Sequence, residues 1–92
     1  MFNFNFNIDK EHVYRDTIKV GNTKRYVVVD SRETPDHGYE SMAFEADSDG
    51  EVLDWGELDV DCYKSWQEMK EGHKEMCERW KTKEVFKGIY DE

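Results

Sequence analysis

The chain has 92 residues, a formal net charge of −9 and a hydrophobic content of 37%, with 14% of all residues aromatic. A chain of this length forms one domain, 1–92, and its aromatic residues favour an ordered core over disorder. The negative charge argues against direct binding to nucleic acid or to anionic membranes.

The cysteines and the termini bear on the compartment. Cys62 and Cys77 are the two cysteines; their separation matches no zinc or redox motif, and two are too few for a secreted disulfide framework. The N-terminal residues lack the basic region of a signal peptide, and no apolar run approaches the ~18 residues that span a bilayer. We therefore expect a cytoplasmic protein with no membrane partner.

The first part of the chain predicts strands joined by short connections. Residues 2–8 alternate phenylalanine and asparagine, which is the period-two pattern of a strand. Residues 14–20 and 24–30 predict a hairpin, because β-branched and aromatic residues flank a Gly-Asn turn signal. Residues 31–38 contain proline, aspartate and glycine, and this composition predicts a loop.

Two further strands are predicted, over 39–46 and 51–62, with a turn at 47–50 between them. Alternation in the second of these strands places apolar side chains inward and acidic side chains outward. The inward set is Leu58, Val60 and Cys62. The outward set is Glu57, Asp59 and Asp61. Gly56 within this strand predicts a bulge.

A helix is predicted to begin at Ser65, since Ser65 and Glu68 have the spacing of a capping box. It is predicted to end or bend near Thr82, because the apolar spacing of the helix does not continue beyond Trp80. Glu75 and Arg79 are spaced to form an ion pair on its exposed face. The opposite face is an apolar stripe formed by Trp66, Met69, His73, Met76 and Trp80. The predicted fold class is α+β, with an antiparallel sheet of about four strands and one amphipathic C-terminal helix packed across one face.

Acidic residues are concentrated in the middle of the sequence. Residues 33–63 contain eleven of the 22 carboxylates and no lysine or arginine. Like charges about 6.6–6.8 Å apart on one strand repel each other unless they are solvated or meet a basic partner. One such partner is a protein that grips nucleic acid, whose phosphates the carboxylates would imitate. The candidate binding residues are Asp47, Asp49, Asp54, Glu57, Asp59 and Asp61.

The sequence predicts no catalytic group, no metal and no cofactor. Residues 45–56 match a calcium loop in part, but a glycine stands where its bidentate carboxylate is needed. His73 and Cys77 lie one helical turn apart, yet two ligands do not make a zinc site, and the sequence does not bring Cys62 or His37 to them. The place of His73 in the apolar stripe predicts a hydrogen-bonded core histidine.

Three short motifs follow one another along the chain: Tyr39-Glu40-Ser41-Met42-Ala43-Phe44, then Cys62-Tyr63-Lys64-Ser65, then Gly72-His73 on the helix. Over residues 26–80 they resemble a family of small phage and prophage proteins of unassigned function, in which an ETMVF-type strand precedes an RY-S/T segment and a GH helix. The resemblance implies a phage origin, the bacterial cytoplasm, a close helix–sheet approach at Gly72 and a hydrogen bond from His73. It marks Tyr39, Met42, Phe44, Tyr63, Gly72 and His73.

Together these features predict a non-enzymatic phage-type accessory protein that binds a host or phage protein through its acidic surface. A second hypothesis is a protein that binds or sequesters a nucleotide, with aromatic side chains for stacking. Its phosphate-binding residues would be Arg15, Lys19, Lys24, Arg25 and Arg32. A third hypothesis is assembly into an oligomer through strand 2–8.

Overall fold

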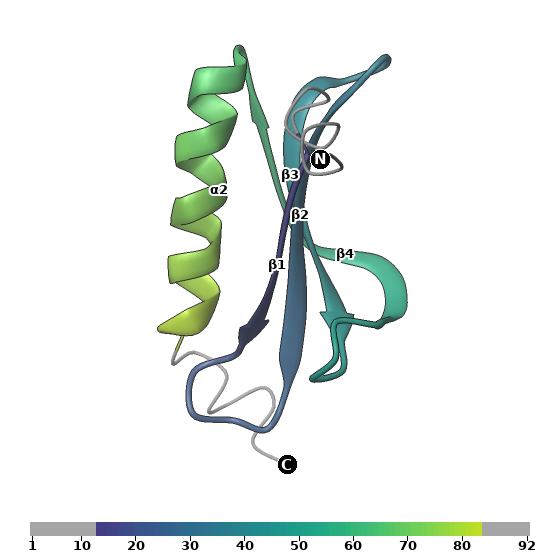
Figure 1. The fold of residues 1–92 in the computed structure, drawn as a ribbon, viewed down its shortest axis with the longest axis vertical. Helices are drawn as coiled ribbons and strands as arrows, with labels where there is room; N and C mark the ends of the chain where they lie inside the picture. Colours follow the sequence, from purple (N-terminus) through teal and green to yellow (C-terminus); the bar gives the residue numbers. More distant parts are fainter. Residues whose placement is uncertain (1–12, 84–92) are drawn as a thin grey trace, which may run out of the picture.

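The computed structural model describes residues 13–83, which form a four-stranded sheet and one helix. The elements are β1 (Tyr14–Lys19), β2 (Tyr26–Thr34), β3 (Gly38–Ala46), β4 (Val52–Tyr63) and α2 (Trp66–Lys81). Each strand pairs antiparallel with the next, so the sheet order is β1-β2-β3-β4. Helix α2 lies across one face of the sheet (Figure 1), which confirms the predicted α+β class. The predicted strand 2–8 lies outside the described residues.

The core between sheet and helix combines small or β-branched strand residues with large helix residues. Val27 and Val29 of β2 and Ala43 of β3 are buried against Met76 and Trp80 of α2. The short strand side chains let the helix approach, and the long helix side chains fill the interval. Full burial of a large apolar side chain contributes about 1.5–3 kcal/mol, so this layer is a main source of folding free energy.

Helix α2 begins after the predicted N-cap, Ser65, and ends at Thr82, where the loss of the apolar spacing predicts its end. Ser65 Oγ accepts a hydrogen bond from the Glu68 amide at 3.1 Å, and the Glu68 carboxylate accepts one from the Lys64 amide at 3.0 Å. The Thr82 amide donates to the Glu78 carbonyl and closes the last turn. The buried face consists of Met69, Gly72, His73, Met76 and Trp80. Within the described residues, no helix is long and apolar enough to cross a membrane.

Strand β2 is longer than predicted. The loop prediction over 31–38 is wrong, because the strand continues to Thr34 and the turn takes only residues 35–37. The polar composition misleads here, since polar residues belong in a strand when their side chains find partners in the fold. The Ser31 hydroxyl does so by contacting the Ser41 hydroxyl across the β2–β3 ladder.

Strand β4 is irregular, and the irregularity overturns the predicted orientation of its side chains. Glu45 of β3 pairs with Asp54 and Ala43 pairs with Asp59, so two steps along β3 correspond to five steps along β4. Three additional residues change which side chains face the helix, because side chains alternate with a period of two. Asp59 and Asp61 consequently lie on the helix side. The set predicted to be inward, Leu58, Val60 and Cys62, is exposed.

Candidate functional site

Strand β4 exposes large apolar side chains at the edge of the sheet. We call these four residues the β4 patch: Leu53 (62% exposed), Trp55 (67%), Leu58 (42%) and Val60 (45%). Within the described part of the chain, β4 has a sheet neighbour on one side only, β3. Single exposed apolar residues are ordinary on a protein surface, but a group of them on an edge strand is typical of an interface with another protein.

The additional residues of β4 project from the sheet on the side away from α2 (Figure 1). Trp55 packs edge-on against Phe44 of β3, with 5.0 Å between the ring centroids. The Gly56 amide donates to Asp54 Oδ1 at 2.8 Å and fixes the local bend. The bulge predicted at Gly56 is confirmed, and its effect is to hold Trp55 over the sheet while most of the indole stays accessible.

Two of the predicted acidic residues belong to this surface. Asp54 and Glu57 are both exposed and flank Trp55 along the strand. An apolar centre with a charged border is the usual anatomy of a protein-binding surface, because the centre contributes affinity and the border contributes orientation.

The turn between β3 and β4 holds two more of the predicted acidic residues. Asp47 Oδ1 accepts hydrogen bonds from the amides of Asp49 and Glu51, at 2.9 Å and 3.0 Å. This is an Asx-type turn, and Gly50 completes it with a φ of 89°. Asp47 therefore shapes the turn, whereas the Asp49 side chain is exposed beside it.

Asp59 and Asp61 are not part of the outer acidic surface. Their carboxylates accept hydrogen bonds from the Arg79 guanidinium at 2.6 Å and 3.0 Å, and Asp59 also accepts one from Trp80 Nε1 at 2.9 Å. The hydrogen bonds to Asp61 and Asp59 raise the pKa of Arg79. The ion pair predicted between Arg79 and Glu75 is wrong, because the guanidinium turns toward β4.

His73 occupies the centre of a buried polar chain between α2 and the sheet. Its Nδ1 lies 2.6 Å from Ser31 Oγ, which in turn lies 2.5 Å from Ser41 Oγ. Its Nε2 lies 2.8 Å from Asp16 Oδ2 on β1. The prediction of a hydrogen-bonded core histidine is confirmed. Ser31, His73 and Asp16 are hydrogen-bonded in the order of a catalytic triad. Ser31 cannot act as a nucleophile, however, because its side chain is fully buried and cannot reach a substrate.

The motif that contains Tyr63 and the Gly72-His73 motif are in contact, because the Tyr63 ring lies against Gly72. A Cβ atom at position 72 would overlap the Tyr63 ring, so only glycine permits this approach of the helix. The Tyr63 hydroxyl is buried and has no partner in hydrogen-bonding geometry among the described residues. Burial raises the pKa of Tyr63, and the nearby Ser41 hydroxyl opposes that rise.

The remaining motif residues lie on β3. Tyr39 pairs with Tyr63 in the β3–β4 ladder, while Met42 pairs with Val60 of the β4 patch. Phe44 is buried beneath Trp55. The motif is therefore spread over both faces of the sheet, and its described contacts are mainly packing contacts.

The arginines of the first hairpin are engaged in ion pairs. Arg15 and Arg32 both bind Asp30, at 3.1 Å and 2.7 Å, and Arg25 binds Glu45 at 2.8 Å. A nucleotide phosphate at this hairpin would have to compete with these carboxylates.

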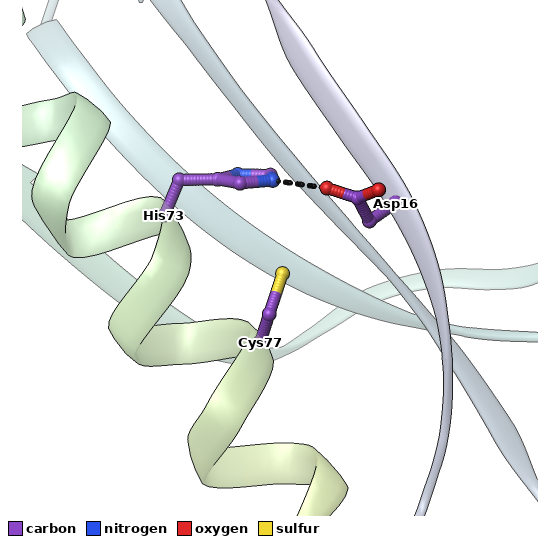
Figure 2. A group of neighbouring side chains, drawn as sticks. All are labelled: Asp16, His73 and Cys77. Carbon is purple, nitrogen blue, oxygen red and sulfur yellow. Dashed lines mark hydrogen bonds and ion pairs between the residues drawn. The ribbon is translucent and has the colours of Figure 1, made fainter.

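Asp16 is a residue that the sequence interpretation missed. Its carboxylate, His73 and Cys77 place ligand atoms within 4.8 Å of one another (Figure 2). Period-two alternation puts Asp16 on the same face of β1 as Tyr14 and Ile18, and this signal would have found it. Cys62 and His37, considered as further ligands, lie elsewhere, in exposed positions on β4 and in the β2–β3 turn.

Comparisons with models of protein families, with curated proteins and with solved structures find no match to this chain.

Proposed function

We propose that this protein is a non-enzymatic accessory protein, of the phage type that the sequence motifs resemble, and that it binds a host or phage protein through the β4 patch. The observation that carries the proposal is the exposure of Trp55 and three other large apolar side chains on an edge strand. Among the described residues no strand covers this edge of β4. An apolar edge favours aggregation unless it is covered, which gives the protein a physical reason to have a partner.

Charge complementarity defines the partner surface. Asp54 and Glu57 border Trp55, and the chain as a whole carries a formal charge of −9. The partner therefore combines an apolar pocket for the indole with a basic rim, and long-range attraction accelerates their encounter. The partner does not meet an unbroken row of free carboxylates, because Asp59 and Asp61 are both bound to Arg79, whose single positive charge offsets one of their two negative charges.

Site-specific crosslinking tests the position of the interface. A photoreactive residue at position 55, in protein produced in bacteria, should crosslink to one protein with a basic surface. The same residue in place of Lys74, which is exposed on α2, should not capture that protein. Equal capture from both positions, or from neither, would contradict the proposal.

Affinity measurements with the captured partner test the chemistry. Trp55→Ala should weaken binding about 30-fold, since a central tryptophan in an interface contributes about 2 kcal/mol or more. Asp54→Lys with Glu57→Lys should slow association and reduce its dependence on salt.

The matched control is Glu71→Lys with Glu78→Lys on the exposed side of α2. Each pair of replacements removes two negative charges and adds two positive ones, which moves the formal charge from −9 to −5. If the double variant on α2 weakens binding as much as the double variant on β4, the loss of affinity results from net charge and not from the β4 patch.

A further inference from the structure

We infer that Asp16, His73 and Cys77 form a binding site for a borderline divalent metal ion, with Zn²⁺ the best chemical match. The inference is independent of the β4 patch, because the three residues lie on the helix side of the sheet and toward its other edge, β1.

The ligand atoms converge from two elements. His73 and Cys77 are one turn apart on α2 and project toward β1, and Asp16 projects from β1 toward them (Figure 2). The imidazole Nε2, thiol Sγ and carboxylate oxygen all lie within 4.8 Å of one another. Zinc bonds of about 2.0–2.3 Å place tetrahedral ligands roughly 3.3–3.7 Å apart. Side-chain rotations that move the ligand atoms by about an ångström would therefore bring them to the spacing of a tetrahedral zinc site.

The surroundings of His73 are those of a metal ligand with a support behind it. Its side chain is 7% exposed, and Nδ1 is held at 2.6 Å by the Ser31 hydroxyl. Nε2 lies 2.8 Å from Asp16 Oδ2, and a cation would replace that hydrogen bond. When Nδ1 carries the proton and donates to Ser31, the Nε2 lone pair and the Asp16 carboxylate can both bind the ion. The Ser31 hydroxyl can then donate to Ser41, since hydroxyl groups rotate to suit their partners. Hydrogen bonds of this kind orient metal-binding histidines.

Access and charge also fit a cation. The Asp16 side chain is 60% exposed on the edge strand β1, so an ion can enter from solvent and the carboxylate can turn to meet it. When the metal–sulfur bond forms, the Cys77 thiol releases its proton to solvent, and thiolate plus carboxylate balance the charge of the ion. Three protein ligands leave the fourth tetrahedral position for water.

Cobalt(II) reports such a site directly, because a thiolate ligand gives a charge-transfer band and tetrahedral coordination gives intense visible bands. Titration of the metal-free, reduced full chain with Co²⁺ should produce both features at one equivalent, and added Zn²⁺ should remove them. Cys77→Ser should abolish the charge-transfer band. Cys62→Ser should leave it unchanged, which makes the exposed second cysteine an internal control.

The carboxylate is tested separately, since Asp16 is exposed and Asp16→Asn should preserve the fold. This variant should bind Co²⁺ at least tenfold more weakly, because even outer-sphere partners contribute about 10–100-fold to metal affinity. The site is refuted if Co²⁺ gives no thiolate band, if the band depends on Cys62, or if Asp16→Asn and the parent protein bind equally.

Discussion

Gly72 sets how closely the helix approaches the sheet. A side chain at this position would overlap the Tyr63 ring at the end of β4, so the ring or the helix must shift to make room. The contact with Tyr63 is the physical reason for a glycine at this position.

Gly72→Ala should therefore lower the free energy of unfolding by about 1–3 kcal/mol, as overpacking in a tight interior does. Urea unfolding measures the change. Tyr63→Ala combined with Gly72→Ala should cost less than the sum of the single changes, because removing the ring removes the clash. Gly56→Ala is the control, since a Cβ there meets only the exposed Asp54 side chain, at 3.3 Å. Additive single changes would show that the ring is not the obstacle.

Single residues differ in how far their roles could be predicted. The burial and hydrogen bonding of His73 follow from its place in the apolar stripe of the helix. The role of Asp16 depends on its proximity to His73 and Cys77, which are distant in the sequence. The separations are 57 positions to His73 and 61 positions to Cys77. No local pattern encodes such a contact, although the alternation of β1 restricts the face on which Asp16 lies.

At the scale of elements, Arg79 links α2 to β4. Its guanidinium bonds to Asp59 and Asp61, and all three groups are partly exposed. Solvent screening reduces the value of each ion pair, yet without Arg79 the two carboxylates would stand together with no cation between them.

Arg79→Met should consequently lower the free energy of unfolding by about 1 kcal/mol, with the methionine retaining part of the aliphatic packing. Thermal or urea unfolding at low and at high salt tests this prediction. The difference in stability between Arg79→Met and the parent protein should be smaller at high salt, because salt screens the repulsion between the two carboxylates. Lys74→Met, on the exposed side of the same helix, should change stability by less than about 0.5 kcal/mol. A loss as large in Lys74→Met would point to a general effect of charge on the helix.

The elements themselves were largely predictable. The start of the helix follows from Ser65 and Glu68, its end follows from the loss of apolar spacing after Trp80, and the alternation over 39–46 matches β3. The orientation of β4 was not predictable, because Gly56 indicates a bulge but not how many residues it adds. An odd number of additional residues exchanges the two faces of the strand. The sequence interpretation therefore placed Asp59 and Asp61 outside and missed the exposure of Leu58 and Val60.

For the whole molecule, the dominant electrostatic fact is the formal charge of −9 on 92 residues. This value is the excess of 22 acidic over 13 basic side chains, so the arginines that form ion pairs, Arg15, Arg25, Arg32 and Arg79, are already counted in it. This excess opposes the compact state more than the expanded one, because folding brings the carboxylates together.

Moderate salt should therefore raise the stability of this protein. As the Debye length falls from about 30 Å at 0.01 M to about 10 Å at 0.1 M salt, the urea midpoint should increase. The Glu71→Lys, Glu78→Lys variant, with a formal charge of −5, should show a smaller increase. A midpoint that falls with salt would mean that the described ion pairs outweigh the net repulsion.

The order of the strands also has a consequence for the way the chain folds. Each strand pairs with its neighbour in sequence, so the hairpins close over short loops. The bonds from β1 to α2 span far more chain, with sequence separations of 52 from Tyr14 to Trp66 and 57 from Asp16 to His73. This topology favours early formation of the meander and late docking of the helix. We therefore expect the His73 chain to form after the folding barrier, so that removing it should speed unfolding more than it slows folding.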